Sequence, residues 1–209
     1  MAKLAKLGAR HNCSRFGKTR NVLPQCYMLS DSVRLPDPTE VLSKLPRGTC
    51  IILRHADPNA RAQLAARIIA PAHKLGLKVI IANDLRLALR MGADGIHMSE
   101  RIARFGRSRI AFHKPGFLCT AAAHNRMALW RAHRAGANAA LLSPVFPTHS
   151  HLHARTLGVL RFGILARLSP IPVVALGGIS HANAARLRSG FKYRKALACG
   201  LAAIDAWRD

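Results

Sequence analysis

A pair of glycines directly after a short apolar run is the first candidate for a ligand-binding turn. The run from Ile171 to Leu176 has the composition of a buried strand and ends at Gly177 and Gly178. Glycine has no Cβ, so the backbone can approach a ligand closely. Ser180 and the Ala- and Leu-bearing segment after it predict a helix start, whose N–H groups and dipole favour an anion. The turn therefore predicts a phosphate site; the alternative is a tight strand-to-helix turn without a ligand.

Short apolar runs alternate with Ala-, Leu- and Arg-rich segments, which predicts βα units and a parallel sheet. The expected strands are residues 26–30, 50–54, 78–82, 95–98, 117–121, 139–143, 172–175 and 200–204. The expected helices are residues 39–45, 59–75, 85–91, 101–105, 126–135, 157–168 and 182–188. Eight strands favour a closed α/β fold, the (β/α)8 TIM barrel, small beside the ~250 residues typical of it. Few residues follow Ile204, so we expect a short or missing last helix, with the N-terminal segment or a partner chain over the gap.

A weak internal repeat supports the barrel. Residues 89–96 resemble residues 132–139, because each segment has helical residues that end at a glycine, then two residues, then an expected strand. The glycines are Gly92 and Gly136, and glycine commonly ends a helix in the left-handed conformation. The same turn chemistry in two units is expected of a repeated βα architecture.

The charge of the chain restricts its partners. Its 209 residues suffice for one domain with a substantial core, and they include 33 Lys and Arg against 9 Asp and Glu, a formal net charge of +24. Such a charge favours small phosphorylated substrates or nucleic acid. The basic residues are spread at helical spacing among alanines, and only 5% of residues are aromatic, unlike a single-strand binder. Nonspecific nucleic-acid binding and a homodimer are left open.

The chain divides into a basic N-terminal arm, residues 1–23, and a barrel domain, residues 24–209. The arm lacks a continuous apolar stretch, so no secretory signal is expected. No apolar stretch reaches the ~18 residues of a membrane span. The five cysteines are odd in number and contain no Cys-x-x-Cys, which indicates neither a disulfide framework nor a zinc site. We expect buried thiols in a reducing compartment and a cytoplasmic protein.

Seven ordered motifs across most of the chain resemble the thiamine phosphate synthase and TenI-like superfamily. They are residues 27–31, 53–54, 80–84 with 87–89, 91–97, 122–124, 142–148 with Gly158, and 172–179 with Asn183. The resemblance implies a TIM barrel and a role in thiamine biosynthesis. In that family the synthase joins a hydroxymethylpyrimidine pyrophosphate to a thiazole phosphate with Mg²⁺. Pyrophosphate leaves first, and the thiazole nitrogen captures the pyrimidine cation.

The resemblance also assigns site residues. Arg54 stands where the family uses an arginine for pyrophosphate, and a guanidinium suits a pair of phosphate oxygens; the alternative is a surface ion pair. Asp84 matches the Mg²⁺ ligand and Asn83 the amide on pyrophosphate, with a helix cap as the alternative for both. The thiazole phosphate is expected to contact Thr148, Ser150, His151, Gly177 and Gly178.

His124 distinguishes two activities within the superfamily. It resembles the histidine that TenI-like thiazole tautomerases use for proton transfer, and an unperturbed pKa near ~6.5 suits that role. A structural histidine at a helix entry is the alternative. We therefore name Arg54 and His124 as the candidate catalytic residues.

Several positions depart from the synthase pattern. Nonmatching residues stand where the family has a glutamine, two lysines, a serine and the second Mg²⁺ carboxylate: Ile52, Ala56, His151, Ala122 and Ile102. Glu100 could replace the second Mg²⁺ carboxylate only if this segment were shifted in register relative to the family pattern. These changes weaken the Mg²⁺ and pyrophosphate sites. We therefore expect a divergent thiamine phosphate synthase, with two alternative functions. One is a thiazole tautomerase, and the other is a catalytically lapsed barrel that binds phosphorylated ligands or nucleic acid.

Overall fold

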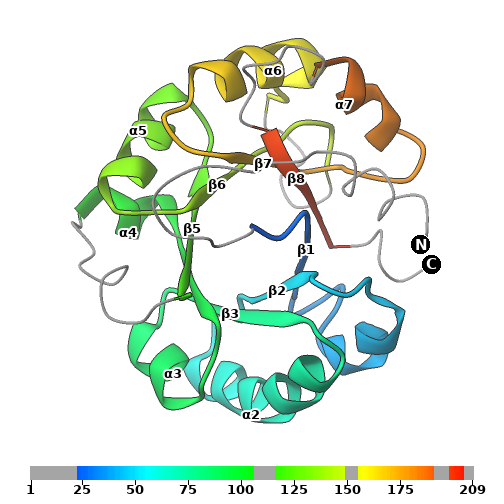
Figure 1. Ribbon diagram of the computed structural model, residues 1–209, viewed down its shortest axis with the longest axis vertical. Helices are drawn as coiled ribbons and strands as arrows, with labels where there is room; N and C mark the ends of the chain where they lie inside the picture. The colour runs from blue at the N-terminus through cyan, green and yellow to red at the C-terminus, as the bar shows by residue number, and fades with distance from the viewer. Residues whose placement is uncertain (1–22, 106–115, 149–154, 191–197, 205–209) are drawn as a thin grey trace.

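Eight parallel strands close into a barrel in the computed structural model, which describes residues 23–105, 116–148, 155–190 and 198–204 (Figure 1). Each strand pairs with the next one along the chain, and the eighth pairs with the first. The predicted TIM barrel is therefore confirmed. The strands are β1 (Cys26–Leu29), β2 (Cys50–Leu53), β3 (Lys78–Ala82), β4 (Gly95–Met98), β5 (Leu118–Ala123), β6 (Ala139–Leu142), β7 (Val173–Leu176) and β8 (Ala198–Ala203).

Helices surround the ring of strands (Figure 1). They are η1 (Pro38–Lys44), α2 (Pro58–Lys74), α3 (Leu85–Arg90), α4 (Glu100–Phe105), α5 (Arg126–Arg134), α6 (Gly158–Leu168) and α7 (Ala184–Gly190). Asp57, Asp84 and Asn125 cap α2, α3 and α5 through side-chain oxygens that accept backbone N–H bonds. These caps begin helices directly after strands, at the end of the barrel where the strands finish.

Four elements differ from the prediction in type or by more than one residue at an end. The segment 39–45 is a 3₁₀ helix, η1, and β8 begins two residues before the predicted strand. β5 begins one residue later than predicted and continues to Ala123. Its alanines have little strand propensity alone, and pairing with β6 holds them in the sheet. The helix predicted from residue 182 begins at Ala184.

The repeated turns have the same structure. Gly92 and Gly136 have positive φ angles of 67° and 82°. In each turn the second residue after the glycine bonds back to the preceding strand: Asp94 exchanges bonds with Val79, and Asn138 with Cys119, all over 2.7 Å. The repeat in the sequence is thus a repeat of helix-to-strand turns.

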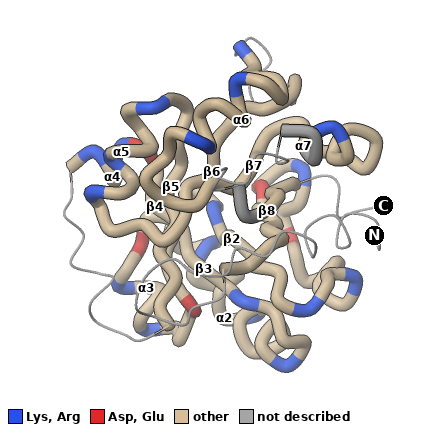
Figure 2. The backbone as a smooth tube through the Cα atoms, turned by 45° about the horizontal axis from the view of Figure 1, so that its top comes forward, with Lys and Arg blue, Asp and Glu red and all other residues tan. Residues whose placement is uncertain are grey.

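The core is apolar, and the charges lie outside it. Cys26, Cys50 and Cys119 are buried free thiols, as expected, and burial raises the pKa of Cys26 and of Cys119 to about 11. Lys and Arg are spread over several helices around the barrel (Figure 2), which fits solvated helix faces. In the described ranges no helix is both long and apolar enough to cross a membrane.

Candidate functional site

A cavity of about 440 Å³ lies where the strands end. Its wall includes residues at or just after the ends of β1, β2, β5, β6, β7 and β8: Leu29, Arg54, His124, Ser143, Leu176 and Ala203. This end of the barrel carries the βα loops, where TIM-barrel active sites are found. The cavity is therefore the candidate functional site.

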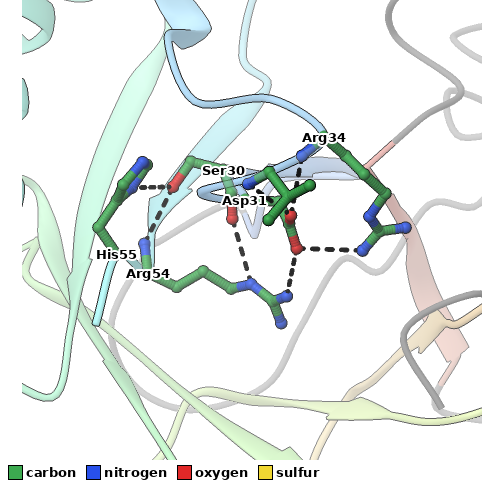
Figure 3. Close-up of polar contacts among 6 residues, drawn as sticks. Ser30, Asp31, Arg34, Arg54 and His55 are labelled. Carbon is green, nitrogen blue, oxygen red and sulfur yellow. Dashed lines mark hydrogen bonds and ion pairs between the residues drawn. The ribbon is translucent and has the colours of Figure 1, made fainter. Parts of the chain in front are cut away.

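Arg54 is held on one side of the cavity by the end of β1 (Figure 3). Its backbone N–H donates to Ser30 Oγ over 3.1 Å, and its Nε–H donates to the Ser30 carbonyl over 3.1 Å. The terminal nitrogen of its guanidinium pairs with Asp31 Oδ2 at 2.9 Å. Ser30 is fully buried and also bonds His55 Nδ1 at 3.2 Å. Arg54 is thus anchored at its backbone and at its guanidinium.

Asp31 is an ionised carboxylate within this cluster. Burial alone would raise the pKa of Asp31, but hydrogen bonds from the Arg34 backbone and side chain, the Val33 backbone and the Arg54 side chain outweigh it. Together they hold the pKa of Asp31 well below its usual range. Asp31 is therefore ionised near pH 7.

Gly177 and Gly178 form a wall of the cavity by close packing. Their φ angles are +96° and +63°, a region that side chains disfavour. A Cβ on Gly177 would lie 2.8 Å from Pro144 Cα, and one on Gly178 would overlap Pro147 O. The turn needs glycine because the β6–α6 loop packs against it, whether or not a ligand binds.

The segment after the glycines corrects one prediction. The Ser180 N–H donates to Asn183 Oδ1 over 2.9 Å, Asn183 Nδ2 donates to Gly178 O over 2.7 Å, and the Ala184 N–H donates to Ser180 O over 3.0 Å. The side chain of Asn183 closes a turn here, and α7 begins only at Ala184. The helix thus begins two residues later than predicted, after a turn that starts at Ser180, and Gly177, Gly178 and Ser180 all line the cavity.

His124 directly follows the end of β5 and lines the cavity. Its Nδ1 is 2.9 Å from the carbonyl oxygen of Ser143, which can only accept, so Nδ1 carries the proton of this hydrogen bond. The neutral ring then has an unprotonated Nε2, the form that can accept a proton from a ligand. This arrangement suits a general base.

His97 is a buried cavity residue that sequence reasoning used only as a landmark. Its Nδ1 lies 2.8 Å from Thr120 Oγ1. Burial, with a contribution from the Arg54 charge, lowers the pKa of His97 to about 4. His97 is therefore neutral near pH 7 and adds no positive charge to the cavity wall.

Asn83 and Asp84 are not among the residues that line the cavity. Asn83 Oδ1 accepts from the Ser99 N–H over 2.7 Å. Asp84 Oδ1 caps α3 through the Leu87 N–H over 2.9 Å, and Asp84 Oδ2 lies 3.5 Å from the Arg61 guanidinium. Asn83 Oδ1 and both carboxylate oxygens of Asp84 thus already have protein partners.

The described residues do not fit a Mg²⁺ site at Asp84. The second carboxylate position is Ile102, and Glu100 lies 3.5 Å from the Arg131 guanidinium. Within the ranges that the structure describes, no group of three or more His, Cys, Asp or Glu side chains could hold a metal ion. We therefore derive no step that passes through a protein-held Mg²⁺.

The structure brings together five of the nine predicted site residues. Arg54, His124, Thr148, Gly177 and Gly178 line one cavity, whereas Asn83 and Asp84 lie apart from it. Ser150 and His151 fall outside the described residues, as do residues 1–22 of the predicted N-terminal arm. Sequence reasoning missed Arg34, which also lines the cavity. The signal available was its spacing, three residues after Asp31.

Known proteins resemble this chain along most of its length. The family model described as thiamine monophosphate synthase matches residues 27–206. A thiamine-phosphate synthase of Bacillus velezensis is 28% identical over 79% of this chain and 77% of its own length. A putative thiamine-phosphate synthase 2 of Aquifex aeolicus is 31% identical over 76% and 87%. The solved structure of a thiamine phosphate pyrophosphorylase from Pyrococcus furiosus shares the fold, with a TM-score of 0.70 at 21% identity over 90% of this chain and 88% of that one.

Proposed function

Since this chain belongs to the thiamine monophosphate synthase family, we propose that it is a divergent thiamine-phosphate synthase. The observation that carries the proposal is one cavity that joins Arg54 with the Gly177–Gly178 turn. Two phosphorylated substrates need two anion-binding regions, and the cavity has an arginine on one side and half-buried glycine backbone on the other.

The proposed reaction exchanges one bond for another. The C–O bond between the pyrimidine methylene and pyrophosphate breaks, and a C–N bond forms from that methylene to the thiazole nitrogen. Arg54 stabilises the charge that grows on the leaving pyrophosphate, while Gly177 and Gly178 hold the thiazole phosphate. Mg²⁺, if used, would arrive with the substrate phosphates, because the described residues do not form a site for it.

A product assay tests this proposal. The purified full chain is incubated with hydroxymethylpyrimidine pyrophosphate and thiazole phosphate, first with EDTA and then with Mg²⁺. We expect thiamine phosphate and pyrophosphate to appear in equal amounts. If neither condition yields thiamine phosphate, the proposed activity is wrong.

A thiazole tautomerase is the second candidate, and the placement of His124 favours it. The bond from Nδ1 to Ser143 O leaves Nε2 as a proton acceptor at a cavity wall, and isomerisation needs no metal. Isomerisation of a thiazole carboxylate phosphate in EDTA, lost in His124→Gln, would support this candidate. An unchanged rate in His124→Gln would exclude His124 as the base.

A further inference from the structure

Asp31 lies between two arginines at the rim of the cavity (Figure 3). Its Oδ2 accepts from Arg34 over 3.1 Å and from Arg54 over 2.9 Å. Both arginines line the cavity, and Asp31 is not among its lining residues. A carboxylate in the wall would repel an anion, but here the carboxylate stands behind two guanidinium groups. The two guanidinium groups are thus the charged groups of this trio that line the cavity.

The loop around Asp31 fixes this arrangement before any ligand binds. Asp31 Oδ1 accepts the N–H groups of Val33 and Arg34 over 3.1 and 3.0 Å. The backbones of Asp31 and Leu35 also exchange hydrogen bonds of 3.2 and 2.9 Å. One carboxylate thus orders its own turn with one oxygen and both arginines with the other. Such preorganisation lowers the entropy cost of binding.

Arg54 has donors to offer a ligand. A guanidinium has five N–H donors, of which the Ser30 carbonyl and Asp31 each take one. Among the described residues the other three have no partner, and 37% of the side chain is exposed. Planar donors of this kind match two oxygens of a phosphate group.

We propose that Asp31 is a positioning residue that holds Arg34 and Arg54 as a two-arginine clamp for a pyrophosphate group, without a protein-held metal. This inference rests on the proposed function and deepens it, because it assigns the leaving-group side of the cavity. Asp84, the residue expected to bring a metal there, is paired with Arg61 instead. The arginines supply the positive charge that a metal ion would otherwise supply.

Calorimetric titration of the full chain with inorganic pyrophosphate in EDTA tests the clamp. We expect the wild-type protein to bind pyrophosphate. Asp31→Asn should weaken this binding by about tenfold, because it removes the charge-assisted hydrogen bonds that hold the two arginines. An asparagine oxygen can still accept the turn N–H groups, so the loop should persist. Asp31→Glu, which keeps the charge, should restore part of the affinity.

Asp37→Asn is the matched control. Asp37 also caps a turn and pairs with one arginine, Arg67 on α2, and none of these residues lines the cavity. We expect its affinity for pyrophosphate to equal that of the wild type. If Asp31→Asn does not fold, Arg34→Gln takes its place, with the same expected loss and with thermal unfolding as a check.

A double variant separates positioning from general damage. Once Asp31→Asn has removed the carboxylate that positions Arg34, adding Arg34→Gln should cost less affinity than Arg34→Gln costs alone. The clamp is overturned if wild-type protein binds pyrophosphate only with Mg²⁺, or if Asp31→Asn binds as Asp37→Asn does. Pyrophosphate binding without condensation activity would defeat the proposed function alone. Condensation activity with an unaffected Asp31→Asn would defeat the clamp alone.

Discussion

The two sides of the cavity are built by different means. On the β1–β2 side, Asp31, Arg34 and Arg54 are joined by charged hydrogen bonds at 2.9 and 3.1 Å. On the β6–β7 side, Gly177 and Gly178 present backbone that the neighbouring loop packs against directly. The first side is set by side-chain charge and the second by shape.

This difference teaches which measurements respond to which side. A charge-built surface loses affinity when one side chain is neutralised, and it responds to salt. A shape-built surface has no side chain to remove, and an added methyl group damages folding first. Binding should therefore report on the first side and stability on the second.

Gly178→Ala is expected to have the largest effect. The new Cβ would meet Pro147 O and Phe146 O at a φ of +63°, so we expect a loss of about 3 kcal/mol or more in the free energy of unfolding. Gly92→Ala is the control, because its φ is +67° and no atom lies within 4 Å of the added Cβ. It should cost only about 1 kcal/mol. Urea unfolding measures both, and equal losses would mean that the loop contact is unimportant.

Arg54→Ala should lower kcat/KM for condensation by about 100-fold, as expected for loss of a donor to developing charge. Affinity for thiazole phosphate alone, measured by calorimetry, should stay near the wild-type value because Gly177 and Gly178 are untouched. Arg67→Ala, which removes an exposed guanidinium from α2, is the matched control and should change neither. If Arg54→Ala lowered the affinity for thiazole phosphate by the same factor as kcat/KM, the division into two sides would be contradicted.

His97 should make stability depend on pH between about 6.5 and 4. Its pKa is lowered to about 4 in the folded protein, so the unfolded chain binds more protons in this range and stability falls as pH falls. The loss should reach about 2 kcal/mol at pH 5 and be reduced in His97→Asn. Arg54→Ala should also reduce it, since the Arg54 charge contributes to the shift. A pH profile identical in wild type and His97→Asn would contradict this account.

Asp84→Asn should have the smallest effect. Asparagine caps helices about as well as aspartate, so α3 should keep its start, and loss of the partly exposed pair with Arg61 should cost at most about 1 kcal/mol. Condensation activity and its response to Mg²⁺ should remain close to wild type. A loss of 100-fold or more would instead make Asp84 a metal ligand and would weaken the case for a clamp of arginines.

The barrel could be predicted from sequence because its signals are local. Each signal is contained within a few consecutive residues: an apolar run, an Asx cap, or a turn such as those at Gly92 and Gly136. The predicted end of a strand was wrong where pairing with a neighbouring strand determines how far it extends. The alanines of β5 are held by pairing with β6, and that pairing is invisible in the segment itself.

The site could be predicted only in part. Arg54, His124, Gly177 and Gly178 were found by motif, and the fold gathers them in one cavity. The role of Asp31 depends on its contact with Arg54, which lies 23 residues further along the chain, directly after β2. The role of Arg34 depends on its bonds to Asp31 within a turn, and the sequence of that turn predicts no more than a loop. The helix after the glycines begins at Ala184, two residues later than predicted, because the side chain of Asn183 first closes a turn with Gly178.

The packing around Gly178 constrains how this protein can diversify. The atoms that a Cβ would meet there belong to the backbone of Phe146 and Pro147, so no change of a neighbouring side chain can make room for it. The opposite rim is formed instead by side chains such as Arg34 and Arg54, which substitution can vary. A library aimed at new substrates should vary the β1 and β2 loops and leave the glycine turn unchanged.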